Sequence, residues 1–277
     1  MVPVTIPHMF AGLANYLSGW VLQSYSVIDS PWNWILRFTL MAAWVLLNLF
    51  CLDLANQRLD ESVQEDFINK PWRPIPTGRL SQREATNLLC IAIPCTLGFS
   101  YFSGGFRESV VMAVLNYIYN DCGVANEHFI LRNLMNAFGF MDFVAGASRV
   151  IAGPQSSFSA LGLLWLATVG AFVFSTISIQ DLYDQEGDSA RNRLTAPLVL
   201  GDWKSRIMTA GAIMVCSLTI PPLFGIRSLA VLICWNAMGF TIAVGVLLSR
   251  CVKRDKENFT LWCAWLVLLY MLPPLRA

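Results

Sequence analysis

Long apolar segments recur along almost the whole chain and constrain its fold more than any other feature. Of the 277 residues, 56% are hydrophobic and only 13% are charged, which is not the balance of a soluble domain. The hydrocarbon core of a bilayer is about 30 Å thick and is crossed by helices of about 20 apolar residues, whose backbone groups bond within the helix. The composition therefore predicts an all-α membrane protein, and it excludes a nucleic-acid binder, a disordered tail and a secreted disulfide scaffold.

Nine apolar segments, each bounded by polar residues, Pro or Gly, are candidate membrane spans. They cover residues 8–27, 33–55, 82–103, 108–120, 128–149, 158–180, 205–223, 228–249 and 258–274. The first is diluted by polar side chains, and the fourth ends in the polar run NYIYND at 116–121, so it either merges with the fifth or lines a cavity. We expect one membrane domain over residues 1–277, a polytopic helical bundle with two helical halves of about 1–150 and 151–277.

Lys and Arg residues gather on one side of these nine spans. Fourteen of the 19 fall on the side that holds the loops 56–81 and 181–204, and five fall on the other. Because basic loops stay in the cytosol, we expect an integral, multi-pass protein with both loops cytosolic. Among internal membranes, the endoplasmic reticulum is the expected location.

The two cytosolic loops contain polar windows of the same design. Residues 53–79 and 180–197 each follow an apolar span and place acids before bases. In the second window Asp181, Asp184 and Asp188 stand at i, i+3 and i+7, which is one face of a helix. Carboxylates so placed repel each other unless a cation lies between them, and oxygen ligands around an open position suit Mg²⁺ completed by phosphate oxygens. The alternative is that both windows are hydrated loops with exposed salt bridges of little energetic value.

Two stretches within these windows carry a resemblance to a known family. NKPWRPIPTGR at 69–79 and DLYDQEGDSARNRLTAP at 181–197 resemble the UbiA superfamily of intramembrane prenyltransferases, whose second motif runs DxxDxxGDxxxxRxTxP. The matching positions of that motif are Asp181, Asp184, Gly187, Asp188, Arg193, Thr195 and Pro197. The resemblance implies a UbiA-like bundle of about nine helices around a central cavity, in which two Mg²⁺-binding motifs face each other and hold an isoprenoid diphosphate.

The first motif departs from the superfamily pattern, which is NDxxDxxxD before NKP or NRP. Alignment on residues 69–71 places Asp66 at the last carboxylate but Ser62 at the middle one. The pairs Asn-Gln at 56–57 and Glu-Asp at 65–66 instead resemble the NQ…ED form of the fungal UbiA-type terpene cyclases. The resemblance therefore implies ionisation of the diphosphate and favours cyclisation over transfer to an aromatic acceptor.

The resemblance and the spacing together assign the site residues, with Asp66, Asp181, Asp184 and Asp188 as the catalytic carboxylates. The expected metal ligands are Asn56, Ser62, Glu65, Asp66, Asp181, Asp184 and Asp188. The expected diphosphate-binding residues are Lys70, Arg73, Asn120, Arg132, Asn136, Tyr183 and Arg193. The implied cofactor is Mg²⁺, and the implied partners are an isoprenoid diphosphate and the lipid bilayer, with no nucleic acid and no evident protein partner.

The function that the resemblance implies is a membrane-bound class I terpene cyclase that converts an isoprenoid diphosphate, expected to be farnesyl diphosphate, into a sesquiterpene. The alternative on the same scaffold is a prenyltransferase that delivers the prenyl group to an acceptor. A transporter is disfavoured, because transporters place ionisable groups near the midplane whereas these acids cluster at one water interface.

Aromatic residues are needed to line a cavity for a carbocation. The candidates are Tyr117, Phe138, Phe140, Phe143, Phe172, Phe174 and Tyr183, whereas Trp262 and Trp265 are interpreted as a membrane-interface belt. His8 and His128 are the only histidines, which excludes a histidine metal site and a Ser-His-Asp triad. His128 is either a general base or an ordinary interfacial residue.

Overall fold

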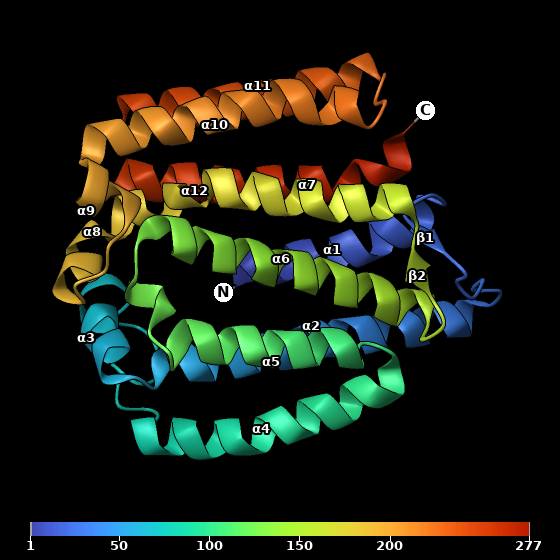
Figure 1. Cartoon of the computed structure of the whole chain (residues 1–277), viewed down its shortest axis with the longest axis horizontal. Coiled ribbons are helices and arrows are strands. Elements are labelled where there is room, and N and C mark those ends of the chain that lie inside the picture. The colour runs from blue at the N-terminus through green and yellow to red at the C-terminus, as the bar shows by residue number, and fades with distance from the viewer. Residues whose placement is uncertain (1, 277) are drawn as a thin grey trace.

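The computed structural model describes the backbone of residues 2–276 and the side chains of residues 7–276. Over that range, nine helices of 15 residues or more run roughly side by side (Figure 1). They are α1 (Val2–Leu17), α2 (Pro31–Gln57), α4 (Gln82–Ser103), α5 (Phe106–Asn120), α6 (Phe129–Ala152), α7 (Ala160–Thr176), α10 (Asp202–Leu223), α11 (Leu229–Leu248) and α12 (Val252–Met271). The expected all-α, polytopic bundle is confirmed.

Short elements gather at the two ends of the bundle. The helices α3 (Asp60–Asn69), α8 (Asp181–Ala190) and α9 (Ala196–Leu200) lie together at the left end in Figure 1. They are joined there by the 3₁₀ turns η1 (Val124–Asn126) and η2 (Ile177–Gln180), while a third turn, η3 (Pro273–Leu275), follows α12. At the opposite end β1 (Leu22–Gln23) pairs antiparallel with β2 (Ser157–Phe158). Both polar windows are therefore at one end of the molecule.

In the part of the chain that the structure describes, five helical runs are long and apolar enough to cross a membrane by length and composition. They are Pro31–Gln57, Gln82–Ser103, Ala160–Ala190, Asp202–Leu223 and Leu229–Leu248. The third runs continuously from α7 through the tighter η2 turn into α8. Because α8 continues this run, the three aspartates of the second window follow directly on a membrane-spanning helix.

The first predicted span is wrong at both ends. The helix ends at Leu17 rather than continuing to residue 27, and it begins at Val2. Ser18 stops it, because its hydroxyl accepts hydrogen bonds from the backbone N–H groups of Trp20 and Val21, and Gly19 then adopts a positive φ of 71°. The fourth and fifth segments are separate helices joined by η1, so the interpretation that they merge is also wrong.

The first and the last long helix, α1 and α12, pack together inside the bundle. α1 packs against both α6 and α12, so the first helix contacts elements from both predicted halves. The division into halves at about residue 150 stays a prediction. The arrangement leaves α1, α2, α5, α6 and α12 around one interior space.

Candidate active site

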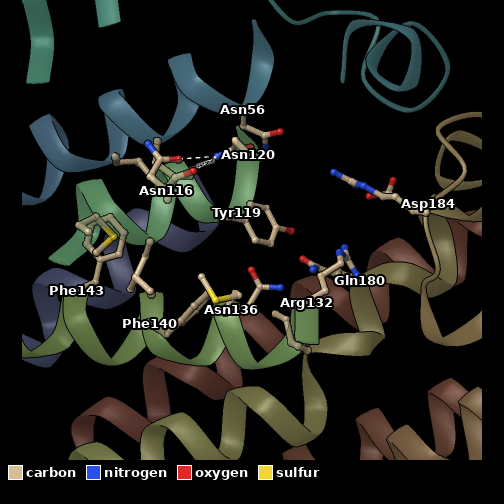
Figure 2. A pocket seen from close by; sticks show the side chains of 18 of the residues that line it. Asn56, Asn116, Tyr119, Asn120, Arg132, Asn136, Phe140, Phe143, Gln180 and Asp184 are labelled. Atoms are coloured by element: carbon tan, nitrogen blue, oxygen red, sulfur yellow. Dashed lines mark hydrogen bonds between the residues drawn. The ribbon is translucent and has the colours of Figure 1, made fainter. Parts of the chain in front are cut away.

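A cavity of about 300 Å³ lies inside the bundle. α6 lines it with Arg132, Met135, Asn136, Gly139, Phe140 and Phe143, which recur every three or four positions and so share one helix face. At 1.5 Å per residue, the wall from Arg132 to Phe143 is about 16 Å long. Figure 2 shows Arg132, Gln180 and Asp184 towards one end and Phe143 towards the other. The cavity thus has a polar end beside the short helices and an apolar end within the bundle.

The polar end is mainly basic. Among the described residues, its charged lining consists of the bases Lys70, Arg73, Arg132 and Arg193 and the acids Glu65 and Asp184. Arginine guanidinium groups bind phosphate oxygens in a forked geometry, and lysine acts as a point charge. The lining thus presents two more bases than acids, and guanidinium and ammonium donors of this kind suit an anionic ligand.

Two of these bases are paired with acids that lie behind the cavity wall. Arg73 Nη1 lies 2.7 Å and 2.8 Å from the two carboxylate oxygens of Asp66. Arg132 Nη1 lies 2.7 Å from Asp181 Oδ1. Asp66 and Asp181 are only 1% and 0% exposed. These acids therefore fix the positions of guanidinium groups that line the cavity.

Other ion pairs join the two polar windows. Lys70 Nζ lies 3.0 Å from Asp184 Oδ2. Arg193 Nη1 lies 3.1 Å from Glu65 Oε1 and equally far from Asp188 Oδ1. The two cross-window pairs connect residues 114 and 128 positions apart. The structure thus brings the two windows together, as the resemblance predicts.

Gly187 allows α3 and α8 to approach this closely. The side-chain amide of Asn69 donates a hydrogen bond of 3.1 Å to the backbone carbonyl of Asp184. A Cβ added at Gly187 would lie 2.2 Å from that same Asn69 nitrogen, which is far inside van der Waals contact. The glycine of the second motif is therefore needed for the contact between the two windows.

Among the described acids, Glu65 forms ion pairs with the largest number of basic side chains. Besides Arg193, the Arg191 Nη1 group donates to Glu65 Oε2 at 3.1 Å. Burial acts to raise the pKa of Glu65, but the positive charges of Arg193, Lys70 and Arg191 outweigh it and hold that pKa below its ordinary value. Glu65 consequently stays ionised and keeps the cluster of bases together.

Ser62, one of the expected metal ligands, is bonded to a basic side chain in this structure. Its hydroxyl accepts a hydrogen bond of 2.6 Å from Arg191 Nη1. Arg191 also donates through Nε to Asn126 Oδ1 at 2.8 Å. In the described structure Ser62 is buried and does not line the cavity. Its observed contact therefore orients Arg191.

The predicted site residues fall into two groups. Those that line the cavity, among the residues described, are Asn56, Glu65, Lys70, Arg73, Asn120, Arg132, Asn136, Tyr183, Asp184 and Arg193. Those buried behind the lining are Ser62, Asp66, Asp181 and Asp188. The structure therefore places all seven predicted diphosphate-binding residues at the surface of the cavity and three of the four predicted catalytic carboxylates one layer deeper.

The carboxylates fit Mg²⁺ in chemistry, although they are paired with bases as they stand. Over residues 7–276, no three His, Cys, Asp or Glu side chains are grouped closely enough to hold a metal ion. Oδ2 of Asp181 and Oδ2 of Asp188 are nevertheless buried with no hydrogen-bond partner in that same range. Buried acceptors of this kind are costly unless a ligand satisfies them, and carboxylate oxygens are the donors that Mg²⁺ prefers.

A band of amides lines the middle of the cavity. Asn120 Nδ2 donates to Asn116 Oδ1 at 2.6 Å, and Asn116 Nδ2 donates to the carbonyl of Cys51 at 3.4 Å. Asn120 Oδ1 and Asn136 Nδ2 are buried and make no hydrogen bond in the described part of the chain. The band therefore keeps an acceptor and a donor available to a polar group.

The apolar end is closed by aromatic side chains and a histidine. The residues at this end include Leu49, Met112, Phe140, Phe143, Trp262 and His8. The Trp262 ring stacks on that of Phe259 with centroids 5.8 Å apart, and Phe259 in turn packs against Tyr183, towards the polar end. Such faces stabilise positive charge by cation–π attraction. This end suits a hydrocarbon chain that carries a cation.

The predicted aromatic lining is correct in part. Phe140, Phe143 and Tyr183 line the cavity. Tyr117, Phe138 and Phe174 are exposed on the outside of the bundle, and Phe172 is buried against Trp265. The interpretation of Trp262 and Trp265 as an interface belt is wrong, because both are buried.

Several lining residues were not identified from the sequence. They include Gln180, Phe259, Trp262 and, in its lining role, His8, whereas Asn116 and Tyr119 line the cavity in agreement with one of the two interpretations of the run at 116–121. Asn116 and Asn120 are four positions apart on α5, so a polar stripe at helical spacing within an apolar span was a usable signal. The residues from α1 and α12 gave no local signal.

Comparisons with known proteins identify relatives of this chain. The family model described as "UbiA prenyltransferase family" matches residues 13–270. Somaliensene A/B synthase of Streptomyces somaliensis is 28% identical over 78% of this chain and 72% of its own length. Fumagillin beta-trans-bergamotene synthase of Aspergillus fumigatus is 26% identical over 83% of this chain and 78% of its own. Digeranylgeranylglyceryl phosphate synthase of Methanococcus aeolicus is 25% identical over 82% and 81%.

Solved structures share the fold. A UbiA homolog from Aeropyrum pernix superposes with a TM-score of 0.70 at 17% identity, covering 96% of this chain and 94% of that one. A UbiA homolog from Archaeoglobus fulgidus, bound to DMAPP and Mg²⁺, superposes with a TM-score of 0.60 at 13% identity, covering 97% and 96%.

Proposed function

Since the chain belongs to the UbiA prenyltransferase family, we propose that it is a membrane-bound class I terpene cyclase which ionises an isoprenoid diphosphate and cyclises the resulting carbocation. The substrate we expect is farnesyl diphosphate, and the expected product is a sesquiterpene hydrocarbon. The proposal depends mainly on one observation, the wall that α6 contributes to the cavity. This wall runs from Arg132 at the basic end to Phe143 at the aromatic end within one cavity.

The basic end supplies what departure of a diphosphate requires. Lys70, Arg73, Arg132 and Arg193 would hold its oxygens. Mg²⁺, when bound, would neutralise the charge that develops on the leaving group. Its proposed ligands come from the carboxylates of both windows: Glu65, Asp66, Asp181, Asp184 and Asp188, with Asn56 beside them. In this proposal Ser62 contributes by holding Arg191, which also bonds to Glu65.

The aromatic end supplies what the carbocation requires. Phe140, Phe143 and Trp262 line it, and apolar walls exclude water that would capture the cation. Two of the relatives compared above are named as a somaliensene synthase and a beta-trans-bergamotene synthase, which supports cyclisation.

One observation favours the second candidate function, transfer of the prenyl group to an acceptor. The amide band leaves Asn120 Oδ1 and Asn136 Nδ2 unbonded within the described residues, and such groups suit a polar acceptor molecule. The deciding difference is whether diphosphate leaves when no acceptor is present.

The test is incubation of the detergent-solubilised protein with farnesyl diphosphate and Mg²⁺, without acceptor. We expect release of inorganic diphosphate and volatile hydrocarbon by gas chromatography–mass spectrometry, and loss of both in excess EDTA. Intact substrate that is consumed only after an aromatic acceptor is added would support the transferase instead. Parallel reactions with geranyl and geranylgeranyl diphosphate would establish the chain length.

We further propose that the end carrying α3, α8 and α9 faces the cytosol, in the endoplasmic reticulum. The excess of Lys and Arg on the side of the loops 56–81 and 181–204 supports this orientation. Protease accessibility of a tag placed in the loop at 77–79, in sealed microsomes, tests it.

A further inference from the structure

We propose that His8 is the base that takes the proton which ends the cyclisation. The assignment rests on the proposed cyclase function and goes beyond it, because neither window and neither metal motif contains this residue. It depends on where α1 places the imidazole.

His8 lies at the apolar end of the cavity. It belongs to α1, is 1% exposed and is one of the lining residues. Its ring centroid is 4.7 Å from that of Phe143 and 5.2 Å from that of Phe140, and Tyr270 on α12 packs against it at 6.0 Å. Aromatic rings from two helices therefore hold the imidazole in one place.

His8 lies far from the basic end of the cavity, which suits the final deprotonation of the carbocation rather than the ionisation of the diphosphate. Phe143, which His8 contacts, is 11 residues beyond Arg132 on the same face of α6, about 16 Å at 1.5 Å per residue. A substrate whose diphosphate lies against Arg132 places its hydrocarbon chain along this wall. His8 thus meets carbon atoms remote from the leaving group.

His8 differs chemically from its neighbours at this end. The surrounding lining residues, Leu49, Met112, Phe140, Phe143 and Trp262, offer hydrocarbon, thioether or aromatic surface. These groups stabilise a cation but cannot accept a proton from it. Among the described side chains at the apolar end, His8 is the one with a basic nitrogen.

The step balances without a further reactant. The C–H bond next to the cationic carbon breaks, its electron pair becomes the new C=C bond, and the proton moves to an imidazole nitrogen of His8. The carbocation becomes a neutral hydrocarbon and His8 becomes an imidazolium. The proton then passes to the released diphosphate or to water before the next turnover.

The experiment measures two readouts for His8→Gln and His8→Phe with farnesyl diphosphate and Mg²⁺. Diphosphate release reports ionisation, and gas chromatography–mass spectrometry reports the products. We expect diphosphate release to continue while the wild-type hydrocarbon falls on the order of 100-fold, the lower range of what a positioned base contributes. Alcohols formed by water capture, or alkenes deprotonated at other carbons, would replace it.

The matched control is His128→Asn, since His128 is the other histidine of the chain. His128 caps α6 by accepting a hydrogen bond from the backbone N–H of Ile130 at Nδ1, which the shorter amide can imitate, and it is not among the described lining residues. It should leave the product profile unchanged.

Chemical rescue separates basicity from packing. His8→Ala is incubated with imidazole or with pyrazole, a ring of the same size that is a much weaker base. Recovery of the wild-type hydrocarbon with imidazole alone supports the proposal, and equal recovery with both would overturn it.

Three other results would also overturn the assignment. An unchanged product profile in both His8→Gln and His8→Phe would place the terminating base elsewhere. Diphosphate release that falls in step with the hydrocarbon in both variants would show a role in folding or ionisation instead. Failure of the wild-type protein to release diphosphate without acceptor would reject the proposed cyclase itself, and the role of His8 with it.

Discussion

Arg132 and Asp181 form an ion pair of 2.7 Å in which the side chains are only 5% and 1% exposed. Each partner also keeps a buried polar atom, Arg132 Nε and Asp181 Oδ2, that makes no hydrogen bond within residues 7–276. A buried pair with spare capacity on both sides is poorly explained as a device for stability alone, because desolvation offsets much of its attraction.

Asp181→Asn should abolish turnover, because it removes the charge of a proposed Mg²⁺ ligand. It also leaves the Arg132 charge buried without a partner, which typically costs about 3–5 kcal/mol of stability. The double variant Arg132→Met with Asp181→Asn should recover thermal stability in detergent but not diphosphate release. Asp29→Asn, at an exposed position that bonds only to Asn33 among the described contacts, is the control. Activity close to wild type in Asp181→Asn would show that Asp181 is not a Mg²⁺ ligand.

Gly187→Ala should separate the two windows. The added Cβ would meet Asn69 Nδ2 at 2.2 Å, so α3 or α8 must move, at a typical cost of about 1–3 kcal/mol. We expect a lower melting temperature and a larger KM for the diphosphate substrate. Gly211→Ala is the matched control, because a Cβ there has no neighbour within 4 Å in the described structure. Equal effects of the two substitutions would show that the close contact is unimportant.

Ser62→Asp tests the place of Ser62 behind the cavity. Since its hydroxyl bonds to Arg191 and it is not part of the described lining, an added carboxylate should pair with Arg191. The Mg²⁺ concentration that gives half-maximal activity should stay the same. Ser62→Ala should cost about 1–3 kcal/mol of stability by leaving a buried guanidinium N–H unbonded. A shifted Mg²⁺ titration in Ser62→Asp would instead return Ser62 to the metal-binding set.

Phe143→Leu should lengthen the cavity at its apolar end. Phe143 is buried between the rings of His8 and Trp44, so a smaller side chain opens space there. We expect the ratio of kcat/KM for geranylgeranyl over farnesyl diphosphate to rise about tenfold, equivalent to about 1.4 kcal/mol. Phe138→Leu, on the exposed side of the same helix, should leave the ratio unchanged. An unchanged ratio in Phe143→Leu would show that another residue limits chain length.

The sequence predicted the bundle well because its signals are local. Apolar length defines helices such as α2 and α11 without reference to any partner, and the spacing of Asp181, Asp184 and Asp188 depends only on the helical period. The end of α1 was misplaced because one hydroxyl, that of Ser18, decides it.

The parts that were missed depend on contacts between distant elements. Ser62 and Arg191 are 129 positions apart, and no feature of the sequence near either residue indicates that they bond. His8 and Trp262 reach the cavity only because α1 and α12 pack together inside the bundle. The layer in which a carboxylate lies, at the surface of the cavity or behind it, is likewise a property of tertiary packing.

Each Lys and Arg among the described lining residues is paired with an acid, and this pairing has a consequence for how the substrate would bind. A diphosphate arriving alone would draw Lys70, Arg73 and Arg132 away from their carboxylates and leave those acids repelling one another. A metal ion that bound alone would take the carboxylates from the same bases and leave those bases without a negatively charged partner. When metal ion and diphosphate bind together, each base exchanges its carboxylate for a diphosphate oxygen and each carboxylate exchanges its base for the metal ion. In the proposed enzyme, binding of the metal ion would therefore raise the affinity for the diphosphate, and binding of the diphosphate would raise the affinity for the metal ion. A neutral prenyl alcohol has no charged group to replace these carboxylates, so it would bind weakly at the polar end of the cavity.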